Sequence, residues 1–288
     1  MRRLVLSILS VFIITLCSSW GYFAHYRINR LAVATLPKGM SAFYKAHISY
    51  ITEHAITADK RRYVDSTEIP HHYFNADRYG RQPFKTMPRK WKDAVAKYSQ
   101  DTILKNGTLL WTIQQNYYWL VKAFKEHDTT AILRTSANLA HYVADAHVPL
   151  HLILNYDGQL TGQTGIHSLW ESRLPEYFSY KYNLKPGKAH YIDNPLTEAF
   201  KICRSSFNSA DTVLRMERIL NKRFPPDKKY AMVKRGNKMV KDYSVEYCRA
   251  YHKMLNGMVE RRMCAAIQSA GSFWFSAWVD AGQPTLTP

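Results

Sequence analysis

Two long windows of the chain repeat apolar residues at helical spacing, and this periodicity restricts the fold more than any other sequence feature. Residues 109–124 form the first window. Residues 129–146 form the second, which stops before Val148-Pro149 because proline cannot continue a helix. Strand-like alternation of useful length is missing, so the sequence predicts an all-α fold. Further helices are expected over 26–35, 195–220 and 232–269, with loops over 68–87 and 152–164.

The first nineteen residues have the pattern of a secretory signal peptide. Arg2 and Arg3 precede the apolar stretch Leu4 to Leu16, which is short for a membrane span. Small residues follow, and cleavage after residue 19 makes Trp20 the first residue of a secreted or periplasmic protein. Lipidation is the alternative for Cys17, but it needs a small preceding residue and Leu16 stands there.

Residues 20–288 are expected to form a single compact multi-helix domain, because they contain no linker, low-complexity tract or second apolar run of membrane-spanning length. The processed protein is expected to be a monomer without a transmembrane helix. The formal net charge is +18, and loss of the two signal-peptide arginines leaves +16. Such a field favours anionic partners, either nucleic acid or the surface of an anionic membrane. Three cysteines remain after cleavage: Cys203, Cys248 and Cys264. At most one internal disulfide can form among them.

Residues 141–155 concentrate side chains that can bind a metal. On the predicted helix, His141 and Asp145 are four residues apart and therefore share a face. Pro149 ends the helix, so His151 approaches from a different backbone direction.

His167 and Glu171 repeat the four-residue spacing on what should be a new helix. A single pair of this kind is more often a surface ion pair than a ligand pair. Two pairs with a lone histidine between them favour a metal site. Imidazole and carboxylate ligands without thiolate suit zinc.

This segment resembles the motif of zinc-dependent phospholipases C, which also occurs in single-strand-specific nucleases of the S-one/P-one type. These enzymes begin with a tryptophan whose amino nitrogen and carbonyl oxygen chelate zinc, followed five residues on by a histidine, as Trp20 and His25 do here. The resemblance runs from Trp20 to Glu171, about three fifths of the mature chain, and implies the helical fold of that superfamily.

The family also has an aspartate and a histidine between these two motifs. Asp59, in Ala-Asp-Lys-Arg-Arg, and His72, in His-Tyr-Phe, fit this pattern best. Asp65 and His71 are the alternatives. The implied site holds three zinc ions, and Asp59 is also the candidate catalytic residue that orients or deprotonates water. The implied ligands are Asp59, His72, His141 and Asp145 for the first ion, His151, His167 and Glu171 for the second, and Trp20, His25 and a bridging Asp145 for the third.

The resemblance predicts a zinc-dependent phosphodiester hydrolase. Glu171 favours phospholipase C, since the nucleases usually have aspartate at this position; the single-strand nuclease is the alternative substrate class. Ala144 and Ile153 depart from the usual phospholipase motif without touching a ligand. A third hypothesis, outside the enzymes, is a non-catalytic protein in which zinc has only the structural role of holding helices together.

Overall fold

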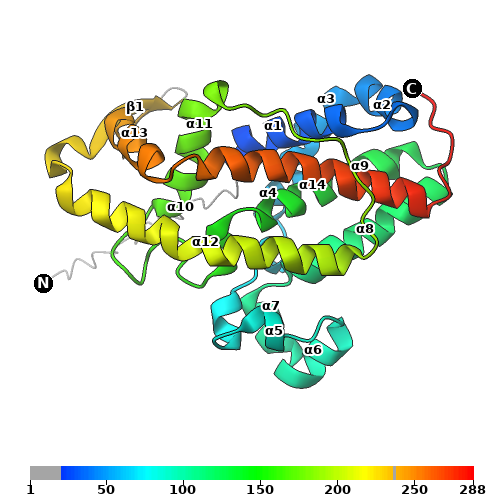
Figure 1. Ribbon diagram of the computed structural model, residues 1–288, viewed down its shortest axis with the longest axis horizontal. Helices are drawn as coiled ribbons and strands as arrows, with labels where there is room; N and C mark the ends of the chain where they lie inside the picture. The colour runs from blue at the N-terminus through cyan, green and yellow to red at the C-terminus, as the bar shows by residue number, and fades with distance from the viewer. Residues whose placement is uncertain (1–20, 236–237) are drawn as a thin grey trace, which may run out of the picture.

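Long helices lie along the long axis of the molecule in the computed structural model, which describes residues 21–235 and 238–288 (Figure 1). Helices α8 (Leu109–Lys125) and α9 (Thr129–Ala146) pack against each other, and α14 (Met258–Asp280) packs against both. Helix α12 (Pro195–Arg223) lies against α8 and α9, and α1 (Tyr22–Ala32) lies against α9 and α14. The prediction of an all-α fold is confirmed in its main feature.

The boundaries of the long helices follow from local capping. The Asp128 side chain accepts a hydrogen bond from the Ala131 backbone N–H at 2.9 Å, which satisfies a free donor at the start of α9. Asn194 does the same for Thr197 at 2.8 Å, and Pro195 occupies the first position of α12, where its missing N–H costs nothing. The windows predicted over 109–124, 129–146 and 195–220 therefore form helices, the last extended to Arg223.

Large aromatic side chains fill the core between these helices. Tyr44 stacks on Trp274 with ring centroids 5.0 Å apart, and both are fully buried. Their polar tips are satisfied by one residue of α9, because the Tyr44 hydroxyl bonds the Ser136 hydroxyl at 2.8 Å and Trp274 Nε1 donates to the Ser136 carbonyl at 2.9 Å. This packing fixes α9, the helix that carries two candidate ligands.

The prediction of one helix over 232–269 is wrong. Strands β1 (Tyr230–Arg235) and β2 (Lys238–Tyr243) form an antiparallel hairpin in register Tyr230 to Tyr243. Val233 and Val240 pair across it and are half-buried, which is the alternation that the sequence analysis overlooked. Helix α13 (Val245–Met254) follows, and Gly257, at φ 72°, separates it from α14.

The remaining elements are short. The expected helix over 26–35 begins earlier, at Tyr22, and its last three residues form a 3₁₀ turn. Ser66–His72 and Ala76–Tyr79 are 3₁₀ turns in a stretch expected to be loop. Within the described ranges, none of the helices has the length and apolar character needed to span a membrane, and the three cysteines are free. The other helices are α2 (Lys38–Ala46), α3 (Ile48–Glu53), α4 (Thr57–Arg61), α5 (Pro83–Thr86), α6 (Trp91–Tyr98), α7 (Gln100–Asn106), α10 (Ile166–Ser168) and α11 (Leu174–Phe178).

Candidate metal centre

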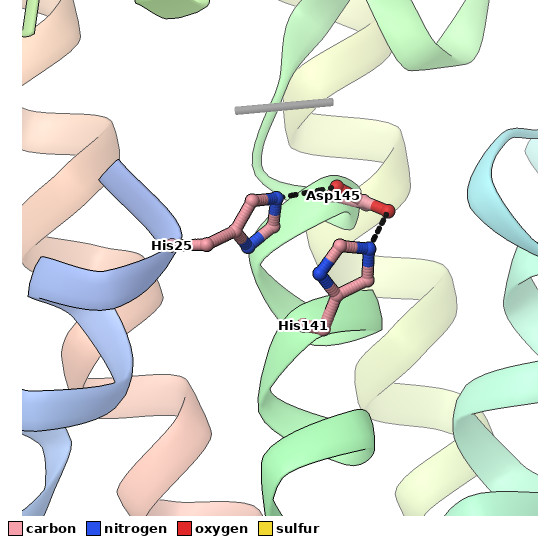
Figure 2. A group of neighbouring side chains, drawn as sticks. All are labelled: His25, His141 and Asp145. Carbon is pink, nitrogen blue, oxygen red and sulfur yellow. Dashed lines mark ion pairs between the residues drawn. The ribbon is translucent and has the colours of Figure 1, made fainter. Parts of the chain in front are cut away.

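Helices α1 and α9 bring His25, His141 and Asp145 together in the interior. Figure 2 shows the Asp145 carboxylate between the two imidazoles, with His25 Nε2 3.4 Å from Oδ1 and His141 Nε2 3.3 Å from Oδ2. The two rings stack with centroids 4.0 Å apart, and all three side chains are fully buried. Each carboxylate oxygen of Asp145 thus faces a different histidine, an arrangement that suits a ligand shared by two ions.

Asp59 on α4 and His72 at the end of a 3₁₀ turn complete a second group with His141. His72 Nδ1 lies 3.0 Å from Asp145 Oδ2, and His141 Nε2 lies 3.1 Å from the same His72 nitrogen. Asp59 Oδ1 is 3.8 Å from both of these nitrogens. One donor atom from each of Asp59, His72 and His141 falls within 4.8 Å of the others, which is close enough to hold one ion.

The alternatives considered for these two positions lie outside the cluster. Asp65 is exposed, and its carboxylate accepts bonds from the Thr67 backbone N–H and hydroxyl at 2.9 and 2.6 Å. The side chain of His71 is 39% exposed and approaches Glu68 at 3.7 Å. The structure therefore brings Asp59 and His72 to the other candidate ligands and leaves their sequence neighbours at the surface.

His151, His167 and Glu171 form a third group. His167 lies on α10, and Glu171 lies on the π-helical turn Leu169–Arg173 that continues it. Glu171 Oε2 is 3.0 Å from His167 Nε2 and 3.5 Å from His151 Nε2. Turns of this wide type occur often at functional sites, and here the turn keeps the four-residue pair on one face.

Backbone carbonyls orient the imidazoles in these groups. His141 Nδ1 lies 2.8 Å from the Ala55 carbonyl, and His151 Nδ1 lies against the His72 carbonyl. Because each Nδ1–H donates to a carbonyl, the lone pair of each Nε2 points into the cluster. This orientation is typical of metal-binding histidine.

The residues of the third group fit a bound cation. His151 Nε2 and both carboxylate oxygens of Glu171 are buried and make no hydrogen bond within the described chain. Buried polar atoms without a hydrogen bond are costly, and a metal ion would satisfy all three. The nitrogen and oxygen donors match the preferences of zinc. Three buried groups of this chain could therefore hold metal ions: His25 with His141 and Asp145, Asp59 with His72 and His141, and His151 with His167 and Glu171.

The charges in the cluster favour cations. Burial by itself raises the pKa of Asp145, but His141 and His151 outweigh it and hold that pKa well below its usual range. Burial would lower the pKa of His151, but Asp145 and Glu171 raise it to about 9. Both shifts reflect the attraction between the buried carboxylates and the imidazoles, and a metal ion bound at His151 would displace the proton that this attraction holds there.

A pocket of about 300 Å³ opens onto the cluster, with His72, His151 and His167 in its wall. Arg62 and Lys105 add positive charge to this pocket. Arg62 Nη2 lies 2.9 Å from Asp59 Oδ1, which links the guanidinium to the candidate catalytic carboxylate. The rest of the lining is mostly apolar or aromatic: Ile69, Tyr73, Asn75, Leu154 and Tyr156.

Sequence reasoning overlooked Glu68, which is buried and lies 3.3 Å from His72 Nε2. Burial raises its pKa, but bonds from His71, His72, Arg61 and Tyr142 outweigh burial and hold the pKa far below its usual range. The four-residue spacing of Glu68 and His72 was the available signal, the same one that identified His141 with Asp145.

Trp20 and the predicted signal peptide lie outside the described residues. Gly21, which follows directly, contacts the π-helical turn that holds Glu171. A Cβ atom on Gly21 would lie 2.3 Å from Ser172 Oγ, so only glycine permits this approach. The chain just after Trp20 therefore lies beside the ligand-bearing turn.

His147, inside the motif but not an expected ligand, has a separate environment. Its Nε2 lies 3.1 Å from the Ser269 hydroxyl. Burial and the nearby Arg262 lower its pKa to about 3, so it is a neutral core histidine.

No protein-family model matches this chain, and a search of curated proteins finds no sequence match either. The resemblance to zinc-dependent phospholipases C and single-strand nucleases therefore stays a prediction from the motifs.

Proposed function

We propose that this chain is a zinc-dependent phosphodiester hydrolase, with phospholipids as its substrate class. One observation carries the proposal: three buried groups of histidine and carboxylate, two of which share His141, lie beside a pocket whose wall contains His72, His151 and His167 together with Arg62 and Lys105. Adjacent cation sites beside fixed positive side chains suit the charge of a phosphodiester.

In this proposal, different residues bind metal, position water and bind the phosphate. Zinc ions held by the three groups would activate water and neutralise charge on the phosphate oxygens. Asp59 orients that water or accepts its proton, and Arg62 holds Asp59 in place at 2.9 Å. Arg62 and Lys105 bind the non-bridging phosphate oxygens from the pocket side.

The pocket lining supports a lipid substrate over a nucleic acid. Ile69 and Leu154 present aliphatic surface that suits a glycerol backbone with its acyl chains. Glu171, where the nucleases usually have aspartate, points the same way. The runner-up is a single-strand nuclease, which Tyr73 and Tyr156 favour because aromatic side chains in a pocket can stack bases.

The open coordination of the third group argues against a purely structural role. Structural zinc sites are closed by four protein ligands, whereas His151, His167 and Glu171 supply three. The pocket reaches His151 and His167, so substrate or water can take the remaining position.

The test uses secreted, zinc-replete protein offered phosphatidylcholine micelles and single-stranded DNA in parallel. Release of the phosphorylated headgroup is expected. Cleavage of DNA alone would replace the lipid assignment with the nuclease. One metal ion per chain without hydrolysis of bis-p-nitrophenyl phosphate would favour the non-catalytic protein.

The variant Asp59→Asn tests whether the Asp59 carboxylate acts as the catalytic base in addition to binding a metal ion. The variant is expected to lose turnover, and Arg62→Gln, which removes both the contact with Asp59 and a positive charge of the pocket, is expected to lower turnover and to weaken substrate binding. Hydrolysis by Asp59→Asn at the wild-type rate with three zinc ions bound would show that Asp59 is not the base.

We also propose cleavage before Trp20, secretion or periplasmic location, a monomeric state and peripheral contact with anionic membranes. N-terminal sequencing of the secreted protein combined with its zinc content tests the first of these. A free amino group on Trp20 and three zinc ions per chain are expected.

A further inference from the structure

Glu68 is a buried carboxylate directly behind a candidate metal ligand. It lies on the 3₁₀ turn Ser66–His72, and its side chain is 7% exposed. Arg61 donates to it through Nε at 3.0 Å and Nη2 at 3.4 Å, and the Tyr142 hydroxyl donates to Oε1. These donors come from α4 and α9, so the carboxylate is held by two elements outside its own turn.

The two ring nitrogens of His72 face opposite partners. Nδ1 points into the cluster, 3.0 Å from Asp145 Oδ2 and 3.1 Å from His141 Nε2. Nε2 points away from the cluster and lies 3.3 Å from Glu68 Oε1, an ion-pair distance at which the two atoms do not form a hydrogen bond of regular geometry. His72 therefore reverses the pattern of His141 and His151, whose Nδ1 atoms face carbonyls and whose Nε2 atoms face the cluster.

We propose that Glu68 is a positioning residue of the metal centre: it accepts the Nε2 proton of His72 and so presents the Nδ1 lone pair to the metal. The inference rests on the metal centre of the proposed function. No backbone carbonyl holds Nε2 of His72 among the described residues, so the carboxylate replaces the carbonyls that orient the other two imidazoles. A carboxylate behind a metal-bound histidine fixes the tautomer and makes the ligand more basic.

Glu217 offers a matched control elsewhere in the same chain. It is also buried, at 1% exposure, and also accepts a tyrosine hydroxyl, from Tyr247 at 2.6 Å, and a cation, Lys229 at 3.2 Å. Its remaining bond comes from Gln163 at 2.6 Å. None of these partners is a candidate ligand, so replacing Glu217 tests the loss of a buried carboxylate without touching the metal centre.

The experiment compares Glu68→Gln with Glu217→Gln in the full secreted protein. Zinc affinity is measured by competition with a chromogenic chelator, and thermal unfolding is measured on chelated protein. Glu68→Gln is expected to lower the affinity for one zinc ion by about 10- to 100-fold. Glu217→Gln is expected to lower stability and to leave the zinc affinity unchanged. Equal zinc affinity in Glu68→Gln and wild type, or equal weakening by both variants, would overturn the proposal.

A milder pair covers the case in which Glu68→Gln does not fold. Tyr142→Phe removes one hydroxyl from Glu68, and Tyr247→Phe removes the matching hydroxyl from Glu217. Weaker zinc binding is expected only in Tyr142→Phe. Unchanged zinc affinity in Tyr142→Phe beside a Glu68→Gln variant that does not fold would count against the proposal.

A metal-free readout separates this inference from the proposed function. Nitrogen-15 spectra of chelated protein report which nitrogen of His72 carries the proton. Chelated wild type is expected to carry a proton at Nε2, beside any proton that Asp145 holds at Nδ1, and Glu68→Gln is expected to lose the Nε2 proton. If wild type bound no zinc, the metal centre would be wrong while the tautomer would still report the role of Glu68. Protonation of wild-type His72 at Nδ1 alone would overturn the positioning role itself.

Discussion

Replacing Asp145 with asparagine removes a carboxylate that faces histidines of two candidate metal groups. Asp145 is fully buried, with Oδ1 3.4 Å from His25 and Oδ2 3.0 and 3.3 Å from His72 and His141. An amide at this position keeps the shape but loses the charge and one acceptor. Both shared ions should therefore be lost, whereas the ion of His151, His167 and Glu171 should remain.

The size of the effect follows from mass action. At free zinc 100-fold above a dissociation constant, one bound ion stabilises the folded state by about 2.7 kcal/mol. Wild type with three ions should gain about 8 kcal/mol on zinc addition. Asp145→Asn should gain only about 2.7 kcal/mol, and Glu171→Gln, which disrupts only the third group, should gain about 5 kcal/mol.

The assay measures zinc per chain by atomic emission and the free energy of unfolding in urea with and without zinc. Comparing each variant with its own chelated form removes the effect of burying or deleting a charge. The expected order of zinc-dependent stabilisation is wild type, then Glu171→Gln, then Asp145→Asn. Three zinc ions and wild-type stabilisation in Asp145→Asn would refute the shared-ligand arrangement.

Three further outcomes are expected. Chelation of the secreted protein should abolish phosphodiester hydrolysis, and zinc should restore it; activity that survives chelation would contradict the proposed function. Gly21→Ala should lower zinc content and stability, because its Cβ would lie 2.3 Å from Ser172 Oγ, and Ser172→Gly should rescue it. Trp274→Ala should cost about 3–5 kcal/mol of unfolding free energy in urea, since its buried ring stacks on Tyr44; a loss under 1 kcal/mol would contradict this packing.

The long helices could be predicted because their signals are local. Helical apolar spacing and a following proline bound residues 129–146, and the structure has α9 over that range. The hairpin at Tyr230–Tyr243 was missed because its two strands are short and rich in lysine and methionine. Its pairing depends on residues up to thirteen positions apart coming into register, and a helical period can be read into the same stretch.

Part of the candidate site is equally local. The pairs His141 with Asp145 and His167 with Glu171 are four residues apart, so helical geometry alone places each pair on one face. Chain periodicity says nothing about which distant residues meet them. The motif resemblance favoured Asp59 over Asp65 and His72 over His71, and the fold buries Asp59 and His72.

By itself, the sequence determined a mostly helical fold, two pairs of candidate ligands and the residue types that suit zinc. Only the tertiary structure decided that α1, α4 and α9 bring their candidate ligands to one buried cluster, that Asp145 faces His25 with one oxygen and His72 and His141 with the other, and that Glu68 lies behind His72. The physical reason is that spacing along one helix is a property of the backbone, whereas contacts between helices depend on how their apolar faces pack.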